Sequence, residues 1–139
     1  QNATSGRYSL MPCLHSYHFL SDGEYLFLHA TQASGDIPVG VFPHNAYQVQ
    51  AMLHITAHLT GLKPKGVKHH VHDAHIYQNQ VQEVERLQLL GSKDQSISLT
   101  FSSDFSAETL FSGDFSDIHS WVQTSEFKTH PALKIKVDS

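Results

Sequence analysis

Apolar residues recur along this chain with two different periods, and each period predicts one kind of secondary structure. Between residues 43 and 59 they recur at every third or fourth position, which predicts a long helix with one apolar face. Pro43 suits the first turn of this helix, and Gly61 suits its C-terminal stop. A second helix is predicted over residues 81–90, because Gly91 follows as a stop signal.

Alternation with a period of two predicts several strands. Residues 8–19 and 24–31 are the first two, and the turn signal Ser21-Asp22-Gly23 between them predicts an antiparallel hairpin. Residues 67–77 form a third predicted strand, and two later strands are expected where Ile97, Leu99 and Phe101, and then Leu133, Ile135 and Val137, alternate with polar residues. Residues 33–40 are punctuated by Gly and Pro and are predicted to form a loop.

Strands and helices that do not alternate strictly indicate the α+β class. The length of 139 residues is typical of one domain, so a single domain over residues 1–139 is expected. Segments 101–106 (FSSDFS) and 111–116 (FSGDFS) echo each other, and two copies this short predict similar turns rather than a repeat protein.

The composition excludes several classes of protein. A hydrophobic fraction of 40% and a charged fraction of 16% are typical of a chain with a packed core. The net charge is −4 and the only arginines are Arg7 and Arg86, so binding to nucleic acid is not expected. No apolar run approaches the roughly 18 residues of a membrane helix, so no membrane partner is expected either.

Cys13 is the single cysteine, and its sequence context leaves two interpretations open. A lone cysteine cannot form an intramolecular disulfide, which favours a reducing, cytoplasmic location. Most lone cysteines are small buried hydrophobic residues. The alternative is a nucleophile, which requires nearby cations or hydrogen bonds that favour the thiolate.

Histidines are concentrated at His69, His70, His72 and His75. On a strand, His69 and His75 would share one face while His70 and His72 share the other. Their spacing matches no standard zinc motif, and no second cysteine is present to help. No metal site is therefore predicted.

Two further groups of polar residues could bind a ligand. Asp73, His75 and Tyr77 share one strand face, where His and Tyr can both hydrogen-bond a sugar hydroxyl; they could equally be ordinary polar residues of a half-solvated sheet. Asn45 lies near a helix start and could be a cap. Its carboxamide could instead offer a donor and an acceptor to the O4 and N3–H edge of uracil.

Five short segments occur along the chain in an informative order. They are Met11-Pro12-Cys13 before an aromatic strand; Ser34-Gly35-Asp36 with Val39-Gly40; Asn45-Ala46-Tyr47 followed by His58-Leu59-Thr60-Gly61-Leu62-Lys63-Pro64; Asp73-Ala74-His75-Ile76-Tyr77-Gln78-Asn79; and His130-Pro131-Ala132-Leu133-Lys134. In this order they resemble the C-terminal catalytic half of the thymidylate synthases and of the related deoxypyrimidine hydroxymethylases. The resemblance implies a mixed sheet with a long central helix.

The resemblance also implies a function, namely folate-dependent one-carbon transfer to C5 of a uracil nucleotide such as dUMP. The cofactor would be 5,10-methylenetetrahydrofolate, and the protein would be a homodimer. Cys13 would add to C6 of the pyrimidine, and Asn45 would bind the uracil edge. Ser34, His75 and Tyr77 would bind the rest of the substrate, and Asp36 would contact the cofactor.

The chain departs from the family pattern at several positions. Leu14 replaces the histidine that follows the nucleophile, and His18 replaces a glutamine in the same strand. Ala33 stands where the family has a phosphate-binding arginine, and His72 replaces the glycine before Asp73. About one extra residue also lies between Asp36 and Asn45.

The family's N-terminal half, which supplies further phosphate-binding arginines, is expected to be missing from this chain or to lie on a separate chain. Alone, the chain should therefore be a poor nucleotide enzyme. Two alternatives to dUMP methylation or hydroxymethylation stay open. One is a non-catalytic binding or scaffold subunit, and the other is an enzyme of altered specificity that acts on a nucleoside or on a different phosphate.

Overall fold

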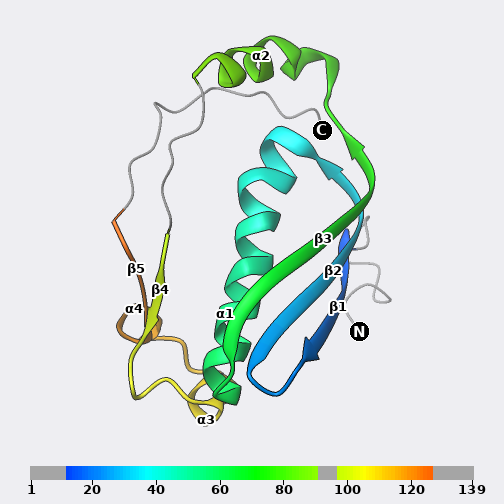
Figure 1. The fold of residues 1–139 in the computed structure, drawn as a ribbon. Helices are drawn as coiled ribbons and strands as arrows, with labels where there is room; N and C mark the ends of the chain where they lie inside the picture. Colours follow the sequence, from blue (N-terminus) through cyan, green and yellow to red (C-terminus); the bar gives the residue numbers. More distant parts are fainter. Residues whose placement is uncertain (1–11, 91–96, 127–139) are drawn as a thin grey trace, which may run out of the picture.

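A three-stranded sheet covered on one face by a long helix forms the centre of the computed structural model, which describes residues 12–90 and 97–126 (Figure 1). The strands are β1 (Leu14–Ser21), β2 (Tyr25–Asp36) and β3 (Lys63–His75), in the order β1-β2-β3. β1 is antiparallel to β2, whereas β3 is parallel to β2. The predicted α+β class with a mixed sheet is confirmed.

The turn between β1 and β2 is the one that the sequence predicts. Asp22 Oδ1 accepts hydrogen bonds from the backbone N–H groups of Glu24 and Tyr25, at 3.0 and 2.8 Å. These bonds also lower the pKa of the Asp22 carboxyl, the one from Tyr25 most. Gly23 has a φ of 98°, which a glycine adopts without strain.

Helix α1 (Ala46–Thr60) connects the two parallel strands and packs on the sheet. Parallel neighbours need such a crossover connection. Its buried face consists of Val49, Leu53 and Ala57. They pack against alternate residues of β2, and the buried core cluster is completed by Leu26, Leu28 and Ala30. The helix ends where predicted, because Gly61 adopts a left-handed φ of 70°.

The predicted loop at residues 33–40 is wrong. β2 continues to Asp36, and a π-helical segment, η2 (Ile37–Asn45), follows it, with extended backbone at Phe42. The strand continues because β3 pairs with it as far as Asp36 and His75, which satisfies the backbone groups that a loop would expose. Helix α1 consequently begins at Ala46, three residues after the predicted start.

The predicted strand 67–77 starts too late and ends too late, since β3 spans Lys63–His75. Tyr77 lies beyond the strand with extended backbone and precedes a short 3-10 turn, η3 (Gln78–Gln80). Helix α2 (Val81–Leu90) then has the predicted bounds.

The last described elements form a small unit on the side of α1 that faces away from the sheet (Figure 1). They are β4 (Leu99–Phe101), α3 (Ala107–Phe111), α4 (Ile118–Trp121) and β5 (Val122–Thr124), with β4 antiparallel to β5. His58 of α1 stacks on Phe101 and donates through Nε2 to the carbonyl oxygen of Phe105, at 3.0 Å. The predicted strand at 133–137 lies outside the described residues.

The echo between segments 101–106 and 111–116 is a pair of similar turns, as predicted. Ser102 Oγ accepts from Asp104 N, and Ser112 Oγ accepts from Asp114 N, both at 3.2 Å. Among the helices of the described residues, none has the length and apolar character that crossing a membrane requires.

Candidate active site

Cys13 lies just before β1 and is exposed, so its thiol is accessible rather than part of the core. Its carbonyl oxygen accepts a hydrogen bond of 2.8 Å from Ala33 N on β2. The next residue, Leu14, pairs with Gln32. The backbone of the candidate nucleophile is thus fixed beside residues 32–34 of β2, where the other candidate site residues begin.

Gln32 is a buried amide that binds Asn45. Its side chain is only 2% exposed, and its Nε2 donates to the Ser34 carbonyl oxygen at 2.8 Å and to Asn45 Oδ1 at 3.0 Å. Its Oε1 must therefore accept from His69 Nε2, 2.9 Å away, which fixes the histidine tautomer with a proton on Nε2. Burial lowers the pKa of His69, so the ring is neutral at neutral pH.

Asn45 is the residue before α1, yet its side chain makes no capping hydrogen bond to the helix. The capping interpretation is therefore wrong for its side chain. The bond from Gln32 fixes the orientation of the Asn45 carboxamide and leaves the Nδ2 protons and the second Oδ1 lone pair available. Asn45 can therefore present a donor and an acceptor side by side.

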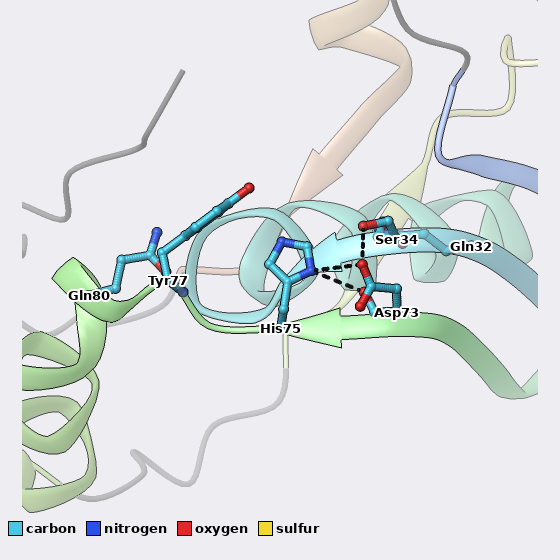
Figure 2. A network of polar contacts seen from close by, with 6 residues as sticks. All are labelled: Gln32, Ser34, Asp73, His75, Tyr77 and Gln80. Atoms are coloured by element: carbon cyan, nitrogen blue, oxygen red, sulfur yellow. Dashed lines mark hydrogen bonds and ion pairs between the residues drawn. The ribbon is translucent and has the colours of Figure 1, made fainter.

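Ser34, Asp73 and His75 meet at the carboxyl ends of β2 and β3 (Figure 2). Ser34 Oγ donates to Asp73 Oδ2 at 3.1 Å. His75 Nδ1 lies 3.2 Å from the Asp73 carbonyl oxygen and 3.4 Å from Asp73 Oδ2. Because both neighbours are acceptors, Nδ1 carries the proton, and Nε2 is left to accept from a ligand hydroxyl. Ser34 donates to a carboxylate and not to a histidine, so this is no hydrolase triad.

Asp36 and Tyr77 are connected by a second buried amide, Gln80. Gln80 Nε2 donates to Asp36 Oδ2 at 2.8 Å, and Gln80 Oε1 accepts from Tyr77 N at 3.1 Å. The Tyr77 ring packs edge-on against His75, with 5.0 Å between ring centroids (Figure 2). Within the described part of the chain, the other Asp36 oxygen, Oδ1, is buried without a hydrogen-bond partner. Such an oxygen fits an N–H donor from a ligand.

Sequence reasoning missed Gln32, His69 and Gln80, which hold the predicted residues in position. Gln32 could have been found, because it is the polar residue that follows Leu26, Leu28 and Ala30 on the buried face of β2. Gln80 had no such signal, since it is fully buried in a short turn after the strand.

Two hollows lie beside the site rather than within it. One, of about 340 Å³, lies between α1 and β3, and its lining includes Phe42, Val49 and His69. The other, of about 400 Å³, lies between α1 and the start of β4, and its lining includes Phe42, Tyr47 and Leu99. Neither hollow is lined by any of the six predicted site residues. These two hollows therefore do not coincide with the cluster of predicted site residues.

The histidines of β3 are divided between the two faces of the sheet, as predicted. His69 lies on the α1 side with Val67 and Val71, whereas His70 and His72 are exposed on the other face. Among the described residues, no group of three or more His, Cys, Asp or Glu side chains is placed to hold a metal ion.

A protein-family model described as "Thymidylate synthase" matches residues 2–139, nearly the whole chain. The chain belongs to the thymidylate synthase family. The resemblance to the thymidylate synthase family that the five sequence segments indicate is therefore confirmed.

Individual thymidylate synthases show the same relationship. The chain is 33% identical over 119 residues to the thymidylate synthase of Shewanella loihica, and the alignment covers 86% of this chain and 39% of that protein. It is 34% identical over 118 residues to the thymidylate synthase of Vibrio cholerae, which covers 85% and 39% of the two chains. The chain therefore spans about two fifths of the length of these relatives.

Two solved structures share the fold. The thermostable thymidylate synthase A from Bacillus subtilis superimposes with a TM-score of 0.75 at 19% identity, over 92% of this chain and 43% of that chain. The thymidylate synthase from T4 phage gives a TM-score of 0.71 at 23% identity, over 92% and 46%. The described elements are thus part of the thymidylate synthase fold.

Proposed function

We propose that this chain forms the nucleophile- and base-binding part of an enzyme that transfers a one-carbon unit to C5 of a uracil nucleotide. The main support is the fixed Asn45 carboxamide, which does not cap its helix and is oriented by the buried Gln32, itself bonded to the half-buried His69. Because the buried Gln32 amide holds the Asn45 amide in one orientation, Asn45 is suited to binding a ligand edge that has a donor and an acceptor side by side. The uracil N3–H and O4 edge is such an edge.

Cys13 is the nucleophile in this proposal. The thiol loses its proton to solvent, the thiolate sulfur forms a bond to C6 of the pyrimidine, and the electrons of the C5=C6 double bond pass to C5 and the O4 carbonyl. Asn45 donates to O4, where negative charge develops, and accepts from N3–H. After C5 is substituted, loss of the C5 proton restores the electron pair to the C5–C6 bond as the sulfur leaves.

The sugar and its phosphate meet different residues. His75 Nε2 accepts from a sugar hydroxyl, and the Tyr77 hydroxyl supplies a second polar contact. Ser34 contacts the phosphate in this proposal once its hydroxyl turns from Asp73 Oδ2 to the ligand, while Ala33 supplies no cation. Since phosphates are normally bound by arginine, the remaining charge has to come from another part of the assembly.

The residues present fit the cofactor 5,10-methylenetetrahydrofolate. Asp36 would hold its pterin ring, because the buried Oδ1 lacks a donor while Gln80 fixes Oδ2. When bound, the cofactor supplies the one-carbon unit that C5 takes up. On the protein side, Asp36 thus binds and orients the donor.

A partner completes this site, and we propose that it covers the outer face of α1. The hollow between α1 and the start of β4 is largely apolar, and Phe42 and Tyr47, which line it, are exposed. The relatives are more than twice as long as the matched region, so they contain chain that can occupy such a face. We call this chain together with a polypeptide that supplies the rest of the family fold the reconstituted protein, and we expect it to form a homodimer.

The test is release of tritium from [5-³H]dUMP by the reconstituted protein with methylenetetrahydrofolate, because substitution at C5 must expel the label. We expect release that the Cys13→Ser variant lacks. The mass of the product separates methylation from hydroxymethylation. Release from deoxyuridine but not dUMP would replace the nucleotide by a nucleoside. No release from either substrate would favour the non-catalytic scaffold subunit.

A further inference from the structure

The two echoed segments FSSDFS and FSGDFS have no part in the proposed reaction, and they differ in burial. In the first segment, Phe105 is only 4% exposed and stacks on His58 of α1, with 5.7 Å between ring centroids. The equivalent residue of the second segment, Phe115, is 50% exposed, and Phe111 at the start of that segment is 82% exposed. The second segment therefore presents two aromatic side chains to its surroundings.

Both segments make the same turn before their second phenylalanine. A serine hydroxyl accepts from the backbone N–H of the aspartate two residues later, Ser102 from Asp104 and Ser112 from Asp114. In the first segment, the phenylalanine after this turn packs on a helix, because its ring stacks on His58 of α1. Since the second segment repeats the turn while its phenylalanines stay exposed, we expect a helix from outside the described chain to pack on them.

The exposed aromatic residues belong to a run in which every residue from 111 to 120 is exposed. Ile118 is a third large apolar residue of this run, and its N–H donates to the Phe115 carbonyl oxygen at 3.2 Å, so a turn brings the two together. Phe111 and Phe115 are four positions apart, so their Cα atoms are at most about 14 Å apart. A helix of about ten residues is long enough to span that distance. We call Phe111, Phe115 and Ile118 the outer apolar patch.

The charge around the outer apolar patch indicates which partner fits it. Residues 97–126 contain five acidic residues and no lysine or arginine. Four of the five are exposed on or beside α3 and α4, namely Asp104, Glu108, Asp114 and Asp117. The hydrogen bond of 3.0 Å from Ser116 N lowers the pKa of the Asp114 carboxyl, so this group is charged at neutral pH. Two copies of this surface would repel each other, and an anionic membrane would repel it too.

We propose that the outer apolar patch binds a basic amphipathic helix of another protein. The apolar face of that helix covers the three exposed side chains, and its lysines and arginines pair with the surrounding carboxylates. This partner is distinct from the polypeptide that completes the family fold. Figure 1 shows α3 and α4 at the end of α1 that lies away from the carboxyl ends of β2 and β3, so this surface is separate from the candidate active site.

The experiment is a titration of a labelled peptide with the chain, followed by fluorescence anisotropy. The probe is a synthetic helix of about 18 residues that contains only leucine and lysine, with leucine at every third or fourth position. We expect saturable binding, and Phe111→Ser and Phe115→Ser should each weaken it by about tenfold, because they remove the apolar anchors. Leu89→Ser in α2 is the matched control. Leu89 is about as exposed as Phe111, and its loss should leave the affinity within about twofold.

The acidic residues are tested separately. The double variant Asp114→Asn with Asp117→Asn keeps the shape of both side chains and removes their charge. It should weaken peptide binding at low salt by about fivefold and reduce the dependence of the affinity on salt. Glu85→Gln, at an exposed position of α2, should leave both unchanged. The same peptide with glutamate in place of lysine should not bind the wild-type chain.

Wild-type affinity in both Phe111→Ser and Phe115→Ser, or an equal loss in Leu89→Ser, would overturn the proposal. Binding by the chain alone but not by the reconstituted protein would overturn it too, because the rest of the family fold would then cover the patch. A dimer in analytical ultracentrifugation that Phe111→Ser abolishes would assign the patch to a second copy instead. Circular dichroism checks that each variant is folded, and substitution of exposed residues should leave the fold intact.

Discussion

At the scale of single residues, the candidate site depends on side chains that contact other side chains rather than the ligand. Gln32 and Gln80 are both buried, and each joins a proposed ligand-binding residue to a neighbouring strand. A buried amide whose NH₂ group and oxygen are both hydrogen-bonded has one orientation. Exchanging the two would place the NH₂ group against a donor and the oxygen against an acceptor. The chemistry that Asn45 offers is therefore fixed by residues that sequence patterns alone do not single out.

Asn45→Asp tests the donor that the base edge requires. An aspartate still accepts from Gln32 Nε2, so we expect little change in the free energy of unfolding. It offers no N–H to O4, so dUMP affinity of the reconstituted protein should fall by roughly 10- to 100-fold, about 1.4–2.8 kcal/mol. Calorimetric titration measures this, with the exposed Asn79→Asp as the matched control. Equal affinity in wild type and Asn45→Asp would contradict the assignment.

His69 predicts a pH dependence of stability. Its pKa in the folded chain lies below the ordinary value of 6.5, so between these two values the unfolded chain binds more protons. The free energy of unfolding should therefore decrease as the pH falls below 6.5 towards the lowered value. In His69→Gln this decrease in the free energy of unfolding at low pH should be absent. Urea unfolding at a series of pH values measures it.

The exposed His29→Gln serves as the control for this experiment, since it lies on the other face of the sheet. Its unfolding profile should keep the wild-type slope below pH 6.5. If His69→Gln also kept the full slope of unfolding free energy against pH, burial of the His69 ring would not be the cause of that slope.

At the scale of elements, the sequence pattern predicted the helix ends and turns that depend on neighbouring residues alone. The bounds of α2, the hairpin turn at Asp22 and the stop of α1 at Gly61 all follow from periodicity and turn residues. The prediction of a loop at residues 33–40 is wrong because β2 is extended there by pairing with β3. The partner residues in β3 lie about forty positions further along the chain. No window of sequence contains that pairing.

Gly35 shows the same dependence on distant neighbours. A Cβ at this buried position would clash with the Val41 side chain and lie 2.8 Å from Gln32 Nε2. Gly35→Ala should therefore displace the amide that holds Asn45 and destabilise the chain by about 1–3 kcal/mol. Urea unfolding measures this change.

Gly66 in β3 is the matched control, because a methyl group added there would meet no other atom within 4 Å. Gly66→Ala should be neutral or stabilising by about 0.4–1 kcal/mol. Equal losses in Gly35→Ala and Gly66→Ala would mean that the crowding around Gly35 is not the cause.

At the scale of the whole molecule, the proposed function makes this chain one side of a larger site. The predicted residues form two polar networks. Ser34, Asn45 and His75 belong to the one that contains Gln32 and Asp73. Asp36 and Tyr77 are joined by Gln80, and the backbone of Cys13 is fixed beside Ser34 by the hydrogen bond from Ala33 N. What the sequence could not predict is where the hollows lie, because one lies between α1 and β3 and the other between α1 and the start of β4, segments that are far apart along the chain.

The most direct measurement of the central claim is the intact mass of the reconstituted protein after incubation with 5-fluoro-dUMP and methylenetetrahydrofolate. Fluorine at C5 cannot leave as a proton does, so the sulfur–C6 bond should persist. We predict one nucleotide and one folate added per copy of this chain, mapped to Cys13 by peptide fragmentation and lost in Cys13→Ser. An unmodified mass, or an adduct on any residue other than Cys13, would contradict the account.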